Sequence, residues 1–322
     1  MSTSLKSLYG SSNNVALDMK FITASQTYTA VRTGRYRITA IGAGGSGGAA
    51  TAGHTATLYA WAQGGCAGGV SQKTVSLTAS NTLTIVIGAG GSNVSVKSDF
   101  PPYSLNGNPG GNTTVVGPGI SLTANGGPGG LATLGTTIIS AQTGGTATGG
   151  DLNNTGGGQP ARPTSTSSGS YGGASIGLTS TGYAPTNAVG AGVGGSAGYS
   201  LIGPVQNGVG NGYNIAGNAI PASFYSVANA PSFFSLMSGT FSVNGSGFGT
   251  GGYYSSTMLV IPGIGGGGST QIGGQSNIIY SGFSATYGGG GGGCTSMYAN
   301  GYINGAGSGA GGAGLVVIEF LG

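Results

Sequence analysis

The glycines that follow the strand-like residues 36–41 are the feature of this sequence most suggestive of chemistry. Residues 42–47 read G-A-G-G-S-G, a formal match to the G-x-G-x-x-G turn that binds dinucleotides. That turn needs a helix that begins within it and an acidic residue about 20 positions later. Here glycine and alanine simply continue, and the first acidic residue after Asp18 is Asp99. The pattern recurs at residues 82–93, so we interpret both glycine runs as structural and expect no cofactor.

Acids and bases for catalysis are scarce. The chain has one histidine and four carboxylates, which lie in different segments: His54, Asp18, Asp99, Asp151 and Glu319. Glycoside hydrolysis needs two carboxylates across the substrate, and general acid–base catalysis needs a positioned titratable group. Glu319 lies in a strand-like run, where exposure to solvent would account for it. We therefore predict that the protein is not an enzyme.

The two cysteines, Cys66 and Cys294, each follow glycines. Two cysteines do not make a disulfide framework, and together with the single His54 they do not make a zinc site. We expect two free thiols, with one bridge between them as the alternative, and no metal.

Aromatic side chains are the remaining candidates for binding. Tyrosine combines a rigid face with a polar tip, which suits contacts with sugars and proteins. The aromatic-rich pieces lie beside glycine stretches, and no charged residue occurs between Arg162 and Glu319. We predict receptor contact through seven residues, the alternative being that they fill a core: Tyr225, Phe233, Phe234, Tyr253, Tyr254, Tyr298 and Tyr302. Uncharged recognition of this kind suits a host surface glycan or the loops of an outer-membrane protein.

Composition limits how these residues can be held. Of 322 residues 75 are glycine, about three times the usual share, and only 4% are charged. Ordering a glycine costs roughly 0.5–1 kcal/mol more backbone entropy than ordering an alanine, so burial of side chains alone cannot offset the excess. Close packing and hydrogen bonding between backbone segments can offset this entropy cost. With 12 prolines and no strict G-X-Y repeat the chain is not collagen, and we predict extended polyglycine II-type helices bonded side by side.

Strand signals cluster near both ends of the chain. Valine, isoleucine and threonine alternate in residues 36–41, 73–79, 81–88, 112–117 and 120–126, and again in the closing G-A-G-L-V-V-I-E-F-L-G. No capped run of helical periodicity is present. We predict an all-β fold in which residues 35–126 and 314–322 form a β-sandwich around a glycine-rich insertion at 127–313. Residues 1–34 are interpreted as an N-terminal attachment segment.

The net charge of +4 comes mostly from the N-terminal third and forms no run of basic residues. Arg35 and Arg37 alternate as on a solvated strand face, so we expect no nucleic-acid partner. No stretch of about 18 apolar residues and no signal-peptide core are present, which predicts assembly in a cytoplasm without membrane insertion.

The order of these segments resembles a known family. The runs Y-R-I-T-A-I-G-A-G-G-S-G-G, G-G-C-A-G-G-V-S-Q-K-T-V-S-L-T-A-S-N-T-L-T-I-V-I-G-A-G-G and A-G-G-A-G-L-V-V-I-E-F are similar to the glycine-rich domain of bacteriophage tail-fibre and receptor-binding proteins. A related domain occurs in the ectodomain of anaplastic lymphoma kinase. The resemblance covers roughly residues 35–127 and 288–321. It implies a jelly-roll sandwich of tumour-necrosis-factor type that carries a hexagonal bundle of polyglycine helices.

The resemblance also implies a function. Phage members of the family are virion components, often adhesins at the tail tip, and the family supplies no catalytic residues. We therefore expect a tail-fibre tip or receptor-binding protein of the virion, joined to other tail or fibre proteins through the N-terminal segment and associating as a homotrimer. The alternatives are a purely structural virion part, such as a baseplate, fibre-linking or capsid-decoration protein, and a cellular surface domain that binds ligands.

Overall fold

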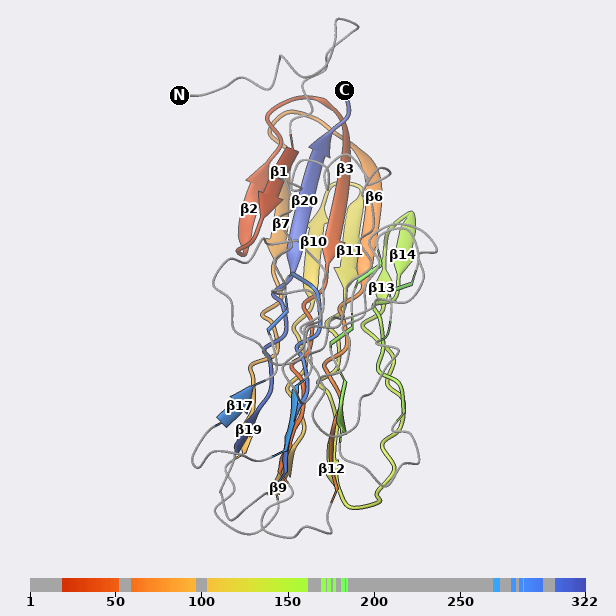
Figure 1. Ribbon diagram of the computed structural model, residues 1–322. Helices are drawn as coiled ribbons and strands as arrows, with labels where there is room; N and C mark the ends of the chain where they lie inside the picture. The colour runs from red at the N-terminus through yellow and green to blue at the C-terminus, as the bar shows by residue number, and fades with distance from the viewer. Residues whose placement is uncertain are drawn as a thin grey trace, which may run out of the picture.

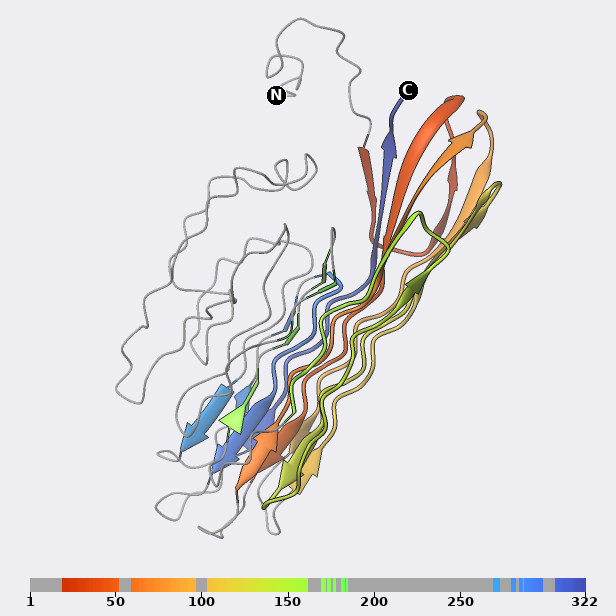
Figure 2. The same cartoon turned by 90° about the vertical axis from the view of Figure 1, so that its right-hand side faces the viewer.

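The computed structural model describes residues 19–51, 59–96, 103–161, 269–272, 279–281, 284–285, 287–297 and 305–322, with short stretches between 169 and 184. All regular elements in this part of the chain are strands, which confirms the predicted all-β class. Figures 1 and 2 show a β-sandwich at one end, a long section of extended glycine-rich chain, and short strands at the other end. Among the described residues no helix is long and apolar enough to cross a membrane.

The first sheet of the sandwich brings together the first and last strands of the described residues. Its five strands are antiparallel and lie in the order β1 (Met19–Ile22), β20 (Leu315–Phe320), β3 (Gly34–Ile41), β6 (Val70–Leu77) and β14 (Leu152–Asn154). In β20, Leu315 pairs with Ile41 and Phe320 with Tyr36. The predicted pairing of the closing strand with residues 36–41 is confirmed.

The second sheet is also antiparallel, and it packs against the first. Its order is β13 (Ala147–Thr148), β11 (Ile120–Ala124), β10 (Thr113–Gly117), β7 (Thr82–Val86) and β2 (Gln26–Thr29). Alternation along the strands sends one face inward, as in β7, where Leu83 and Ile85 are buried between exposed neighbours. The core between the sheets includes Ile22, Tyr36 and Ile38 from the first sheet.

Strands from outside residues 35–126 and 314–322 also take part in the sandwich. The first two strands, β1 and β2, lie within residues 1–34, so the sandwich takes in the chain from residue 19 onward. The strands β13 and β14 lie within 127–313 and extend the two sheets at the opposite edge. The jelly-roll strand order remains a prediction.

Hydrogen bonding around residues 42–48 repeats every third residue. The N–H groups of residues 42, 45 and 48 donate to one neighbouring segment, those of 43 and 46 to a second, and those of 44 and 47 to a third. The carbonyl acceptors lie in three segments, residues 63–69, 108–111 and 309–312. Three other segments donate N–H groups to the carbonyls of residues 42–48, and the donors are Gly91, residues 127–130 and residues 291–294. Three residues per turn is the geometry of an extended polyglycine II-type helix. The predicted glycine bundle is therefore present, with neighbours on all sides of this central segment.

Glycine is required where these segments touch. A Cβ added to Gly44 would lie against the Gly289 carbonyl, and one added to Gly290 against the Gly65 carbonyl, both closer than the 3.0 Å that real Cβ atoms respect. Small side chains occur only where the packing leaves room, as at the buried Ser46. The glycine content therefore reflects contact between backbones.

Asparagine side chains complete the hydrogen bonding on the outside of the bundle. The side-chain oxygens of Asn106 and Asn112 each accept a hydrogen bond of 2.9 Å, from the N–H groups of Ala132 and Gly126 respectively. The two asparagines are six residues apart, which is two turns of a three-fold helix. They substitute for backbone carbonyls at the edge of the bundle.

At its far end the bundle finishes in three short sheets, which together with residues 135–140 we call the tip. One has the strand order β16 (Ser269–Ile272), β18 (Cys294–Met297), β4 (Ala49–Thr51), β9 (Tyr103–Leu105). Another has the order β12 (Ala132–Leu134), β5 (Ala60–Ala62), β15 (Gly169–Ser170). The third has the order β17 (Ile279–Ser281), β19 (Gly305–Gly307), β8 (Ser95–Val96). Met19 pairs with Glu319 at the other end of the molecule. The first described residue and the C-terminus therefore lie at the end of the sandwich away from the tip (Figure 1).

Candidate functional site

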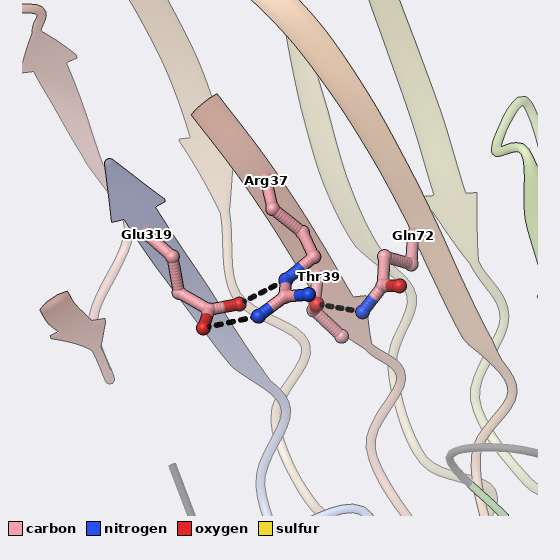
Figure 3. A network of polar contacts seen from close by, with 4 residues as sticks. All are labelled: Arg37, Thr39, Gln72 and Glu319. Carbon is pink, nitrogen blue, oxygen red and sulfur yellow. Dashed lines mark hydrogen bonds and ion pairs between the residues drawn. The ribbon is translucent and has the colours of Figure 1, made fainter. Parts of the chain in front are cut away.

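The carboxylate of Glu319 is committed to an ion pair. Glu319 and Arg37 are register partners on β20 and β3. Arg37 donates from Nε to Oε2 at 2.6 Å and from Nη2 to Oε1 at 2.7 Å, as Figure 3 shows. This hydrogen bond to Glu319 raises the pKa of Arg37. The expectation that Glu319 faces solvent is wrong, because opposite charges directly across two strands pair instead, and the Glu319 side chain is only 1% exposed. The Arg37 side chain is 37% exposed. Arg35, two residues from Arg37 on the same strand, is exposed as predicted.

A neutral pair continues this row of polar contacts. The Nε2 atom of Gln72 donates to the Thr39 hydroxyl at 2.8 Å (Figure 3). Thr39 and Gln72 are register partners on β3 and β6, and Thr39 is two residues after Arg37 on β3. The two pairs together span three strands, with Glu319 on β20, Arg37 and Thr39 on β3, and Gln72 on β6. We assign them a structural role in tying β20, β3 and β6 together.

The two cysteines are free thiols, as predicted, and both are buried, Cys66 in the bundle and Cys294 at the start of the tip strand β18. Burial raises the pKa of the Cys66 thiol to about 12, which keeps it protonated at neutral pH and unreactive. Among the described residues no group of three or more histidine, cysteine and acidic side chains could hold a metal ion.

The tip carries exposed apolar side chains. Tyr103 and Leu105 lie two residues apart on the edge strand β9 and therefore point to the same side. Tyr103 is 53% exposed, and Ile138, in the connection after β12, is 71% exposed. Large apolar groups with this much exposure are candidate contact points, because binding to a partner removes them from water.

Buried contacts position the chain beside Ile138. The indole of Trp61 is buried with its ring centroid 6.0 Å from that of Tyr171, and Ile139 packs in the same cluster. The side chain of Gln63 donates to the carbonyls of Ser140 and Pro160 at 2.9 and 2.7 Å. Ile139 is thus held inside while its neighbour Ile138 projects outward.

The seven predicted receptor-binding residues lie outside the described residues: Tyr225, Phe233, Phe234, Tyr253, Tyr254, Tyr298 and Tyr302. The strands on either side of Tyr298 and Tyr302 are β18 and β19, and both belong to the tip. Sequence reasoning missed Tyr103, Leu105 and Ile138. A signal was present for the first two, since P-P-Y-S-L-N-G places apolar residues at alternate positions between turn-forming residues.

A second candidate lies at the opposite end, between β1 and β2. It is a groove of about 390 Å³ whose lining includes Lys20, Tyr28, Arg32, Tyr36 and Phe320. The Lys20 ammonium lies 5.3 Å from the centre of the Tyr28 ring, and the Arg32 guanidinium 5.2 Å from that of Phe320. No described lining residue is acidic. The groove combines cations and aromatic faces, a combination that suits an anionic or aromatic side chain of a partner.

Comparison with known proteins agrees with this architecture. The model of a family described as the glycine-rich domain matches residues 22–321. The match runs from the end of β1 to the residue after β20 and so includes the sandwich, the bundle and the tip. The chain therefore belongs to the glycine-rich domain family. A search of curated proteins found no match.

Proposed function

We propose that this protein is the host-recognition tip of a bacteriophage tail fibre, a virion adhesin that binds without catalysis. The observation that supports the proposal best is the placement of exposed apolar residues on the tip, at the opposite end of the bundle from the first described residue and the C-terminus. A bundle of mutually bonded backbones is a stiff spacer. It would present the tip to a host surface while the sandwich is attached to the particle.

The chemistry of the tip suggests the class of receptor. None of the described tip residues is charged, and Tyr103, Leu105 and Ile138 project from it. Contact would therefore depend on aromatic and apolar packing and on hydrogen bonds from backbone, serine and threonine. This suits a surface glycan or the loops of an outer-membrane protein, and binding should depend little on salt concentration.

Attachment to the particle is proposed at the other end of the molecule. The N-terminal segment leads into β1, and the groove that contains Lys20 and Arg32 lies beside that strand. A neighbouring tail or fibre protein would hold the chain there.

The test is adsorption of virions to host cells. Particles that carry Tyr103→Ala with Ile138→Ala should assemble normally and lose most of their adsorption, because a few exposed anchors carry much of a binding energy. Leu321→Ala is the matched control, since Leu321 is 36% exposed on the sandwich and does not line the groove, and it should adsorb like the wild type. Normal adsorption of the tip variant would refute the adhesin proposal. Failure of that variant to assemble would favour the structural role in the virion.

A further inference from the structure

The charges of this molecule are segregated. Every charged residue that the structure describes lies on a strand of the first sheet or beside one: Lys20, Arg32, Arg35, Arg37, Lys73, Asp151 and Glu319. The strands of the second sheet carry none, and neither do the described bundle segments. Among the described residues, the first sheet and its surroundings therefore carry the charges, and the second sheet and the bundle carry none.

The outer face of the second sheet consists of β-branched side chains. On β7 the outward residues are Thr82, Thr84 and Val86, all exposed. On β10, Val116 is 51% exposed and pairs with Thr84. Valine and threonine at these positions make a flat surface with an apolar centre, whereas exposed sheet faces ordinarily carry lysine and glutamate.

This surface continues down the bundle. The strands β7, β10 and β11 run directly into bundle residues 87–94, 106–112 and 125–131 on the same side of the molecule (Figure 2). Outward positions there are small, polar and uncharged, such as Ser92 and Asn108. We call the outer face of the second sheet and this part of the bundle together the charge-free face.

Its area is sufficient for a stable contact. Over the sheet, five strands about 4.8 Å apart and about five residues long, at about 3.4 Å each, cover roughly 24 by 17 Å, or about 410 Å². Over the bundle, three segments of about seven residues, at about 3.1 Å each, cover roughly 14 by 22 Å, or about 310 Å². The sum is roughly 720 Å², and a standard interface buries about 600–1,000 Å² on each partner.

We propose that the charge-free face packs against the same face of a second copy of this chain, in a two-fold dimer. Contact there would bury none of the described charged residues, and interface cores are depleted of charged residues. A contact through the first sheet would instead bring the cations of two copies together. Val86 and Val116 would meet near the two-fold axis. The pairwise contact differs from the expected trimer.

Measurement of mass at defined concentration tests the contact. The wild-type chain of 30.6 kDa should sediment at twice that mass at micromolar concentration. Val116→Lys should weaken the association by about 100-fold, because two like charges would then be buried face to face. Val31→Lys, at an exposed site outside the face, should remain a dimer. A circular dichroism spectrum unchanged from that of the wild type would show that each variant is folded.

Cross-linking provides the second measurement. Both native thiols are buried, so mild oxidation would join copies only through an introduced cysteine. Val116→Cys should give a covalent dimer, and Val31→Cys should remain a single chain. The proposal would be overturned if the wild-type chain stayed monomeric even at a concentration about 100 times higher than micromolar, or if its mass were that of a trimer. Equal cross-linking of the two cysteine variants would also overturn it.

Discussion

Replacement of Gly290 by alanine is the most direct test of how the bundle is stabilised. The added Cβ would meet the carbonyl carbon and oxygen of Gly65 on the neighbouring segment. The two segments are joined directly by the hydrogen bond from Gly65 to Gly291, and Gly290 also donates to Ala174 on a third segment. The backbones must therefore move apart, and both hydrogen bonds weaken.

The magnitude follows from these contacts. Overpacking a well-packed interior costs about 1–3 kcal/mol, and each weakened hydrogen bond costs about 0.5–1.5 kcal/mol. The lower entropy of the unfolded alanine variant offsets about 0.4–1 kcal/mol. We expect Gly290→Ala to lower the free energy of unfolding by about 3 kcal/mol, equivalent to a decrease in Tm of roughly 6–12 °C. Valine at Gly290 or Gly291 should prevent folding.

The matched control is Gly111→Ala, on an outer segment of the bundle. Its Cβ would lie 3.0 Å from the nearest atom, the backbone nitrogen of Ala89, so a small shift relieves the contact and stability should change by less than about 1 kcal/mol. Urea denaturation followed by circular dichroism measures both variants. Equal stability of Gly290→Ala and Gly111→Ala would refute the argument that backbone contact requires glycine.

Three further predictions concern the contacts described above. Glu319→Gln should lower the free energy of unfolding by about 1–3 kcal/mol through loss of the charged hydrogen bonds to Arg37, whereas the exposed Arg35→Ala should change it by less than about 0.5 kcal/mol in the same denaturation assay. Because the pKa of Cys66 is raised from 9.0 to about 12, its contribution to stability is complete below pH 9. Above that pH it falls by about 1.4 kcal/mol per unit, and melting curves of Cys66→Ala should lack this part of the decline. Asn112→Ala should cost about 1 kcal/mol by leaving the Gly126 N–H without its acceptor, while Asn112→Asp, which keeps an acceptor oxygen, should retain more of the stability measured by thermal melting.

Much of the fold could be predicted from local patterns. Alternation of β-branched residues indicated β3, β7, β10, β11 and β20 to within a few residues, because half-buried strands need it. The short strands of the tip were not predicted. Three-residue strands such as β4 (Ala49–Thr51) and β19 (Gly305–Gly307) consist of glycine, alanine and threonine and have no periodicity. They adopt an extended conformation because they pair with neighbouring segments that are themselves extended.

The candidate site was less predictable than the fold. The seven aromatic residues were chosen for their position beside glycine stretches, and they lie outside the described residues. Tyr103 and Ile138 are exposed because β9 is an edge strand and because Ile139, not Ile138, packs with Trp61. Which of two adjacent isoleucines points outward depends on the position of Trp61, more than 70 residues earlier in the sequence.

The sequence by itself determined the class of structure. So many glycines and so few charges exclude an ordinary core and leave packed backbone as the means of order, and strand signals at both ends require the chain to return to where it began. Only the tertiary structure decided which residues contact one another. Glu319 is buried because the register places it opposite Arg37, and Gly290 must be glycine because Gly65 lies beside it. Both depend on contacts between residues more than 200 positions apart, which a local pattern does not encode because each segment has several neighbours of nearly the same composition.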